Sequence, residues 1–398
     1  MTVAPGTMKI DSGEFWGRDP QEELSWMRAN APVYWDEASG LWGIASYDLV
    51  KEVEGNPAVF SNANGIRPDT GPIPMMIDMD DPQHKARRKL VSRGFTPQRV
   101  RALEPRIDQI VNRLIDRVCE QGTCDFVWDL AAWLPLIMIG DALGVDESDH
   151  PTLLEWSDDL LRGQGQTDPV AIEKMIGAFA GYCEYAEKVI ADRRENSQDD
   201  LISVLVDAEV DGEKLSDDAL IHESLLILIG GDETTRHVIS GGGYQLLTHR
   251  DQWDRLRADR SLMETAVEEM LRWVSPIKNM ARTVTTDVEF HGCSIKAGQQ
   301  LLLLYPSANR DETHFDDPFQ FDIERTPNDH VAFGFGTHFC LGSSLARLEL
   351  RGFFNVLADR LPDIRPVGEA EPEFRPASFI SGYEAMPVEF TPTSPVGA

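Results

Sequence analysis

Apolar residues recur at helical spacing along most of the chain. The clearest case lies between residues 99 and 120, where one face of a helix is apolar. Further helices are expected over residues 152–162, 171–195, 199–209 and 341–361. The longest is expected over residues 216–249, and its middle, residues 225–229, is apolar on all sides, as in a helix that crosses a core.

Two helix starts carry recognisable signals. Asp81 followed by Pro82 predicts an N-cap and a proline at the first position of a basic helix that runs towards residue 94. Ser261 and Glu264 have the spacing of a capping box, which predicts the start of a helix that Pro276 ends.

Stretches that favour strands are short. They are residues 41–46, 281–290, 300–304 and 385–390. No linker rich in glycine, serine or proline divides the chain. We therefore expect a single domain over residues 1–398 that is mainly α with a minor β-sheet, and whose ends, residues 1–10 and 391–398, are loose.

Composition narrows the function and the compartment. The 398 residues include 37 Lys and Arg against 67 Asp and Glu, a net charge of −30 that argues against nucleic-acid binding. Five cysteines without a paired spacing suit a reducing cytoplasm. The longest apolar stretch, residues 130–140, is interrupted by Pro135 and is shorter than the about 20 residues of a membrane span. The start resembles no secretory signal, so we expect a soluble cytoplasmic protein without a membrane anchor.

Common cofactor and nucleophile motifs are absent from the sequence. There is no phosphate-binding Gly-x-x-x-x-Gly-Lys loop and no Gly-x-Ser-x-Gly elbow. Gly334 and Gly336 open a dinucleotide fingerprint, but Phe339 stands where its third glycine belongs. These signatures therefore give no nicotinamide site.

Residues 333–342 place one cysteine, Cys340, among aromatic residues and glycines, directly before an expected helix. A thiolate at a helix N-terminus is stabilised by the helix dipole and by free N–H groups. Glycines such as Gly342 let a flat cofactor approach the backbone. An inert buried cysteine is one alternative, and half of a zinc site with His338 is another, although no partner pair at zinc spacing follows.

The order Phe-x-x-Gly-x-His-x-Cys-x-Gly in this segment resembles the heme-thiolate signature of the cytochrome P450 monooxygenases. The resemblance implies the P450 fold and heme b with Cys340 as its axial thiolate, which favours O–O cleavage. It also implies that Phe333 packs beside the sulfur and that His338 reaches a heme propionate.

Two basic positions match the family's propionate clamp. His84 and Arg88 are four residues apart and so lie on one helix face. Arg282 matches a further propionate partner. Without the resemblance, an exposed basic helix would explain the first pair.

Glu269 and Arg272 are three residues apart, which by itself is a bland surface pair. In the family such a pair belongs to a core ion network, and Arg325 stands where the completing arginine is expected. We expect this network to be structural.

Residues 230–235 put two glycines, two acids and two threonines into the longest helix. Glycine costs about 1 kcal/mol relative to alanine there, and such a local inconsistency is typical of a functional site, although a structural kink is the alternative. The segment matches the family's oxygen-activation motif, with Glu233 as the acid and Thr234 as the alcohol. The Thr234 hydroxyl can also bond the carbonyl of Gly230.

Segments 62–68, 74–80, 225–237 and 278–280 are most similar to actinobacterial cytochromes that oxidise the side chain of cholesterol and cholest-4-en-3-one. The resemblance predicts a long, dry substrate channel, in which methionines adapt to a flexible chain. Its lining is expected to include Ile66, Met75, Met76, Ile77, Leu226, Ile229, Gly230, Met280, Phe379 and Ile380. The expected reaction is hydroxylation of a terminal side-chain methyl, with the carboxylic acid as the end of a longer sequence. A branched fatty acid or another lipid is the alternative substrate.

The resemblance implies external electron donors, a ferredoxin and an NAD(P)H-dependent ferredoxin reductase. An acidic ferredoxin would be steered to a cationic patch, for which scattered surface charges are the alternative. The patch is expected to comprise Lys85, Arg87, Lys89, Arg93, Arg99, Arg101, Arg347 and Arg351. Rival functions are a non-catalytic heme sensor, a peroxide-using enzyme and a purely structural helical protein; the Glu233–Thr234 pair speaks against the first two.

Overall fold

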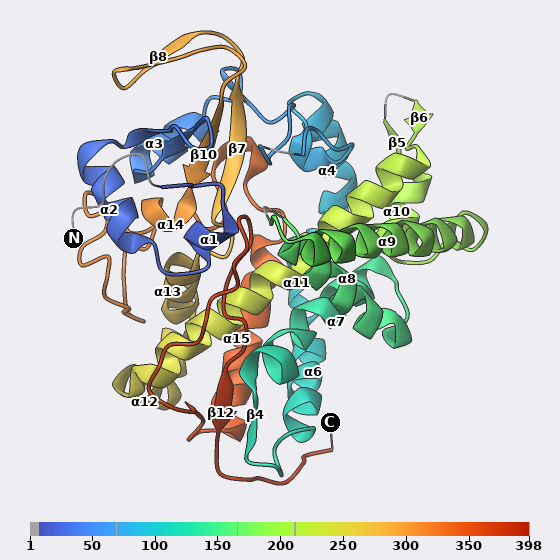
Figure 1. Ribbon diagram of the computed structural model, residues 1–398. Coiled ribbons are helices and arrows are strands. Elements are labelled where there is room, and N and C mark those ends of the chain that lie inside the picture. Colours follow the sequence, from blue (N-terminus) through green and yellow to red (C-terminus); the bar gives the residue numbers. More distant parts are fainter. Residues whose placement is uncertain (1–7, 69, 165, 211, 398) are drawn as a thin grey trace.

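The computed structural model describes residues 8–68, 70–164, 166–210 and 212–397. Helix α11 (Asp217–Thr248) runs diagonally through the molecule, and the other long helices gather around it (Figure 1). Further helices are α1 (Gly13–Trp16), α2 (Gln21–Asn30), α3 (Tyr47–Glu54), α4 (Gln83–Ser92), α5 (Pro97–Arg101), α6 (Glu104–Asp116), α7 (Trp133–Leu143), α8 (His150–Arg162), α9 (Pro169–Glu195), α10 (Leu201–Asp207), α12 (Arg250–Ala258), α13 (Met263–Val274), α14 (Tyr305–Ala308) and α15 (Ser343–Arg360). Short helical turns are η1 (Met76–Asp78), η2 (Arg93–Phe95), η3 (Phe126–Ala131), η4 (Glu147–Asp149), η5 (Arg260–Leu262) and η6 (Gly336–His338).

Helix α11 is buried because two hydrophobic clusters enclose it. One cluster joins it to α6, α13 and α15, and the other joins it to α7, α8, α9 and α10. Gly242 lets α13 approach closely, because a Cβ at this position would lie 2.6 Å from Cγ of Met270. The expected bounds of this helix are confirmed to within a residue, and the Ser216 hydroxyl caps its start by accepting from the N–H of Ala219.

A five-stranded sheet lies to one side of α11, beside α1, α2, α3 and α14 (Figure 1). Its strand order is β1-β2-β10-β7-β3; β10 runs parallel to β2, and the other neighbours are antiparallel. The strands of this sheet are β1 (Val33–Asp36), β2 (Leu41–Ile44), β3 (Phe60–Ser61), β7 (Asn279–Val284) and β10 (Gln300–Leu304). Smaller sheets are formed by β4 (Thr123–Asp125), β11 (Arg365–Pro366) and β12 (Pro387–Glu389), by β5 (Glu209–Val210) and β6 (Glu213–Lys214), and by β8 (Val288–Phe290) and β9 (Cys293–Ile295). The expected fold class, mainly α with a minor β-sheet, is confirmed.

Two helix predictions were wrong in detail. The helix expected over residues 99–120 is divided into α5 and α6, because Pro105 in the first turn of α6 prevents the helix from continuing through Arg101. The expected capping box is also absent: Asp259 accepts hydrogen bonds from the N–H and the hydroxyl of Ser261, and α13 begins only at Met263.

The basic helix α4 begins at Gln83, one residue later than expected. The carboxylate of Asp81 does not cap its backbone. It contacts Lys85 at 2.9 Å and Nδ1 of His84 at 3.3 Å instead, so Asp81 acts on side chains of the first turn.

The described parts of the chain ends are held in place, contrary to the expectation of loose ends. Ile10 is fully buried, and its N–H donates to Asp36. Near the C-terminus, the N–H groups of Val396 and Gly397 donate to Asp116. Residues 1–7 and 398 lie outside the described residues.

One described segment, Phe126–Leu143, has the length and mean hydropathy of a membrane span. It covers η3 and α7, and 72 % of it is buried inside the protein, where α7 packs against α11. It is therefore accounted for as a core segment.

Candidate active site

The cysteine loop is fixed against the end of α3. The N–H of Cys340 donates to the carbonyl of Phe333 at 2.9 Å, which closes the loop before α15. Gly336 has a φ of +71°, and a Cβ there would lie 2.7 Å from the carbonyl oxygen of Glu54. Only glycine therefore permits this approach, and it positions η6 and Cys340.

The Cys340 thiol lies at the N-terminus of α15, as expected. Burial raises its pKa, while the N–H groups of Gly342 and Ser343 and the charges of Arg88 and Arg347 lower it. The dipole argument from the sequence thus has the right sign, but burial outweighs it in this chain alone. A bound metal ion changes this balance, because coordination deprotonates a thiol.

Four cation-capable side chains gather beside this loop. His84 and Arg88 come from α4, Arg282 comes from β7, and His338 comes from η6. The rings of His84 and His338 lie 4.0 Å apart between centroids, and Arg88 donates to the carbonyls of Phe339 and Thr337. The structure thus brings together four residues that are up to 254 positions apart in the chain.

The cluster has the character of an anion site. Burial, with the nearby His84, Arg282 and Arg88, lowers the pKa of His338 to about 3. Its Nε2 is buried and has no hydrogen-bond partner. A carboxylate placed among these groups would relieve their mutual repulsion. The donor set therefore fits the propionates of a heme, whose iron Cys340 would hold.

Glu54 is a buried acid of this region that the sequence analysis missed. It accepts from Arg282 at 3.2 Å and from the Tyr305 hydroxyl at 2.8 Å. Burial raises its pKa to about 7 in spite of the Arg282 charge. Glu54 thus orients Arg282, and no spacing pattern links these residues because they lie 228 positions apart.

Helix α11 is packed on one side of its glycine pair and open on the other. A Cβ at Gly231 would lie 2.6 Å from Cγ1 of Ile139 in α7. A Cβ at Gly230 would meet nothing within 4 Å, and Gly230 is exposed although it lies in the middle of the central helix. The Thr234 hydroxyl donates to the carbonyl of Gly230 at 2.9 Å, as expected. The open side of the helix thus provides space for a small molecule next to Thr234.

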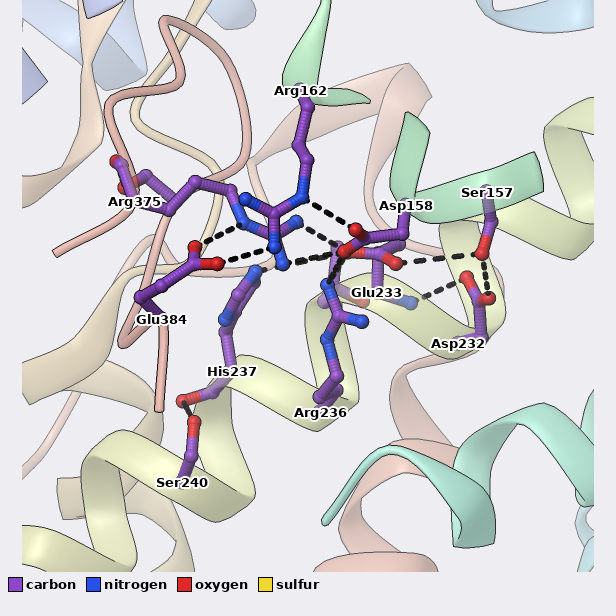
Figure 2. A network of polar contacts seen from close by, with 12 residues as sticks. Ser157, Asp158, Arg162, Asp232, Glu233, Arg236, His237, Ser240, Arg375 and Glu384 are labelled. Carbon is purple, nitrogen blue, oxygen red and sulfur yellow. Dashed lines mark hydrogen bonds and ion pairs between the residues drawn. The ribbon is translucent and has the colours of Figure 1, made fainter. Parts of the chain in front are cut away.

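The acid next to Thr234 lies in a buried ion network (Figure 2). Glu233 is fully buried and contacts Arg236 one turn later in α11. It also contacts Arg375 of the C-terminal segment, with Nη1 3.4 Å from Oε2. Asp158 of α8 binds both arginines, at 3.2 and 2.5 Å. The sequence analysis missed Asp158 and Arg375.

The expected ion network around Glu269 is present, and the Glu269 and Arg272 side chains are fully buried. Arg272 donates to both carboxylate oxygens of Glu269, at 2.8 and 2.7 Å, and Arg325 donates to the same carboxylate at 3.1 Å. Asn328 adds a donor at 3.1 Å. Arg272 also holds the carbonyls of Asn309 and Pro318, so the network ties α13 to the segment before the cysteine loop.

The expected pocket residues divide into two groups. Ile66 and Ile380 are 3 % and 2 % exposed, and Ile380 pairs with Ile277 in a β-bridge, so both side chains are buried. Phe379 is half-buried beneath the guanidinium of Arg67, 4.1 Å from its ring centroid. The remaining members are half-buried, apart from the exposed Gly230: Met75, Met76, Ile77, Leu226, Ile229 and Met280.

The expected cationic patch is smaller than the sequence suggests. Arg87 is paired with the buried Glu223 at 3.2 Å, and Arg347 is paired with Glu268 at 2.6 Å. Lys89 and Arg101 are exposed. Lys85 and Arg99 are exposed beside single carboxylates, Arg351 is half-buried, and the Arg93 side chain lies outside the described part of the structure.

The zinc alternative lacks ligands. Among the described residues, no group of three or more His, Cys, Asp or Glu side chains could hold a metal ion. His338 and Cys340 therefore do not belong to such a site.

Comparison with known proteins identifies the family. The cytochrome P450 family model matches residues 166–358. A steroid C26-monooxygenase of Mycolicibacterium smegmatis is 54 % identical over 94 % of both chains, and a methyl-branched lipid omega-hydroxylase of Mycobacterium bovis is 36 % identical over 96 % of this chain and 95 % of its own. A Mycobacterium marinum cytochrome P450 solved with pseudoionone superimposes with a TM-score of 0.90 at 33 % identity, covering 98 % of this chain and 100 % of its own. The chain therefore belongs to the cytochrome P450 family of heme monooxygenases.

Proposed function

We propose that this monooxygenase hydroxylates the terminal methyl of a steroid side chain, with cholest-4-en-3-one or cholesterol as substrate and the carboxylic acid as final product. Heme supplies the chemistry of oxygen activation when it is bound. Cys340 would hold its iron, and His84, Arg88, Arg282 and His338 would bind its propionates. The observation that carries the heme-binding part of this proposal is the gathering of four cation-capable side chains beside the cysteine loop. One of them, His338, has a buried nitrogen without a hydrogen-bond partner.

Thr234 and Glu233 would bring protons to the oxygen site. Insertion of one atom of O2 into a C–H bond releases the other as water and consumes two electrons and two protons. The Thr234 hydroxyl donates its proton to the Gly230 carbonyl beside the open side of α11, so its oxygen is placed to accept a hydrogen bond from a water in that space. Glu233 would relay protons to that site, accepting each one as a carboxylate and passing it on.

The steroid assignment rests on the relative from Mycolicibacterium smegmatis and on the apolar half-buried residues of the pocket. Methionine side chains at Met75, Met76 and Met280 would adapt to a flexible alkyl tail. A methyl-branched lipid is the second candidate, because the Mycobacterium bovis relative acts on that class by name.

Electrons would come from a ferredoxin and an NAD(P)H-dependent reductase in the cytoplasm. Lys89 of α4 and Arg101 of α5 are exposed. They would form the centre of the docking surface for an acidic ferredoxin.

Heme ligation is tested by replacing Cys340 with alanine. The strongly red-shifted Soret band of the reduced carbon-monoxide complex should disappear, because that shift requires an axial thiolate. Cys183→Ala, a half-buried cysteine of α9, serves as the control and should keep the band. An unaltered band in the Cys340 variant would refute the assigned ligand.

Substrate class is tested by the spin-state change on binding. Cholest-4-en-3-one should shift the ferric heme to high spin with tighter binding than a methyl-branched fatty acid. The reverse order would favour the second candidate, a branched-lipid hydroxylase.

A further inference from the structure

Arg375 joins the catalytic region to a loop that carries two of the expected pocket residues. Its N–H donates to the carbonyl of Gly382 at 2.8 Å. Its carbonyl accepts from the N–H of Ala377 at 2.8 Å and from the Ser381 hydroxyl at 2.6 Å. These bonds close residues 375–382 into a compact loop, and residues 379 and 380 lie inside it.

The side chain of Arg375 points from this loop to a group of carboxylates (Figure 2). It is 1 % exposed. Nη1 lies 3.4 Å from Oε2 of Glu233, and Nη2 lies 2.5 Å from Oδ1 of Asp158. Its Nε also lies 3.6 Å from Glu384. A single guanidinium thus links the loop, α11 and α8.

The surroundings of Glu233 make it the anionic member of a carboxyl pair. Its neighbour Asp232 accepts from the Ser157 hydroxyl at 2.7 Å, and burial together with the Glu233 charge raises the pKa of Asp232 well above its ordinary value. Burial also raises the pKa of Glu233, but two guanidiniums in direct contact oppose that effect. The contacts therefore favour a negative charge on Glu233, which touches two guanidiniums, over one on Asp232, which accepts from a hydroxyl.

Other groups facing Glu233 offer little competing positive charge. Ser157 of α8 lies 3.4 Å from Oε1. His237 lies 3.7 Å from Oε2, but burial and Arg236 lower the pKa of His237 far below its ordinary value, so that this ring is neutral. Arg236 and Arg375 are thus the two cations that contact the Glu233 carboxylate, and the Asp158 carboxylate contacts the same two guanidiniums.

We propose that Arg375 is a positioning residue for Glu233: it holds this carboxyl in its ionised form and ties it to the loop of residues 375–382. Protonation of Glu233 weakens one of the three contacts that anchor Arg375 to carboxylates, and the loop loosens. The charge of the acid and the order of a loop beside the pocket are thereby coupled. An effect of this coupling on turnover rests on the proposed role of Glu233 in proton delivery, whereas the coupling itself does not.

The matched control is Arg162. It belongs to the same network and binds Asp158 and Glu384, each at 2.5 Å. Unlike Arg375, it does not contact Glu233. Both Arg162 and Asp158 line a surface cleft of about 620 Å³ bordered by Trp128 and Trp133. Replacing Arg162 therefore removes a cation from the solvent side of the network.

The first experiment is an infrared titration of the Glu233 carboxyl in the ferric holoenzyme, identified by subtraction of Glu233→Gln. Arg375→Gln should raise the pKa of Glu233 by about one unit or more, since an adjacent cation lowers a carboxyl pKa by about 1–3 units. Arg375→Lys should restore most of the wild-type value, and Arg162→Gln should change it much less. An unchanged Glu233 titration in Arg375→Gln, or an equal shift in Arg162→Gln, would overturn the proposal.

The second experiment needs no Arg375 variant and no substrate. The protection of residues 375–382 against amide hydrogen exchange, taken relative to the intrinsic exchange rate at each pH, should fall in the wild type as Glu233 becomes protonated. In Glu233→Gln, this protection should be low at every pH. The same pH dependence in both proteins would show that the loop does not respond to Glu233. Because neither experiment uses a steroid, failure of the substrate assignment leaves both results meaningful.

Discussion

The hydroxyl of Thr234 donates a hydrogen bond to the carbonyl oxygen of Gly230, 2.9 Å away and one turn earlier in α11. The bond fixes the hydroxyl oxygen on the side of the helix where Gly230 is exposed. It leaves the lone pairs of that oxygen free to accept a hydrogen bond from a water. The Thr234 hydroxyl is thereby held on the side of the helix where a Cβ at Gly230 would have no atom within 4 Å.

Removal of this hydroxyl should uncouple electron consumption from product formation. Thr234→Ala should keep heme and substrate binding but release peroxide, because the hydroxyl that would order a proton-delivering water is lost. The measurement is product and peroxide formed per NAD(P)H consumed, with a product yield lower by roughly tenfold or more. Thr234→Ser, which keeps the hydroxyl, should stay close to the wild type. Equal product yield in Thr234→Ala would exclude the assigned role.

The two adjacent glycines of α11 should respond oppositely to alanine. Gly231→Ala should destabilise the protein by about 1–3 kcal/mol, because its Cβ would lie 2.6 Å from Ile139. Gly230→Ala should be neutral or stabilising by up to about 1 kcal/mol, because its Cβ meets nothing and alanine favours a helix. Free energies of unfolding test both. Gly230→Ala should nevertheless change substrate binding or coupling, since the methyl occupies the open side of α11. Equal stability losses in the two variants would contradict the packing described.

Glu223 should make the protein less stable as pH rises. It is fully buried beside Arg87, and burial raises its pKa to about 7. The folded chain therefore binds more protons than the unfolded chain between the ordinary pKa of 4.5 and about 7, and stability falls as pH rises through this range. Glu223→Gln should remove up to about 3 kcal/mol of that decline.

The check is urea unfolding at about pH 5 and about pH 8. Glu213→Gln, an exposed residue of β6, is the control and should keep the wild-type pH dependence. A decline in Glu223→Gln as large as in the wild type would assign the effect to another group.

Charge reversal at Lys89 should slow reduction by an acidic ferredoxin. Lys89 is exposed on α4, the helix that carries His84 and Arg88, so an acidic partner docked there approaches the cysteine loop. Lys89→Glu should lower the second-order rate constant by roughly tenfold at low salt, with convergence to the wild type at high salt. Lys296→Glu, an exposed position beside β9, is the charge-matched control. Rates that ignore both the substitution and the salt would argue against docking at α4.

The sequence predicted best where interacting residues are neighbours in the chain. Helix α11 could be placed because Ser216 caps it and its apolar pattern is long. The bond between Thr234 and Gly230 and the pair of Glu269 and Arg272 follow from helical spacing. The cysteine loop is one contiguous segment, so its residue types alone carry the signal.

Tertiary contacts were beyond the sequence pattern. Asp158 and Arg375 lie 217 positions apart, and neither belongs to a motif. In the fold, Arg375 contacts the Glu233 carboxylate, and Asp158 binds Arg375. Only the i,i+4 pair with Arg162 could have pointed to Asp158. The capping box failed because Asp259, two residues before Ser261, competes for the same N–H and hydroxyl groups. Ile66 and Ile380 are buried, and apolar character in the sequence does not distinguish a pocket wall from core.

The position of the oxygen in the product tests the central claim most directly. The enzyme would be reconstituted with ferredoxin, reductase and NAD(P)H, and its products from cholest-4-en-3-one would be analysed. Oxygen should appear on a terminal methyl of the side chain, first as alcohol and later as acid. Oxygen on the rings, or no steroid product beside efficient hydroxylation of a methyl-branched fatty acid, would contradict the account.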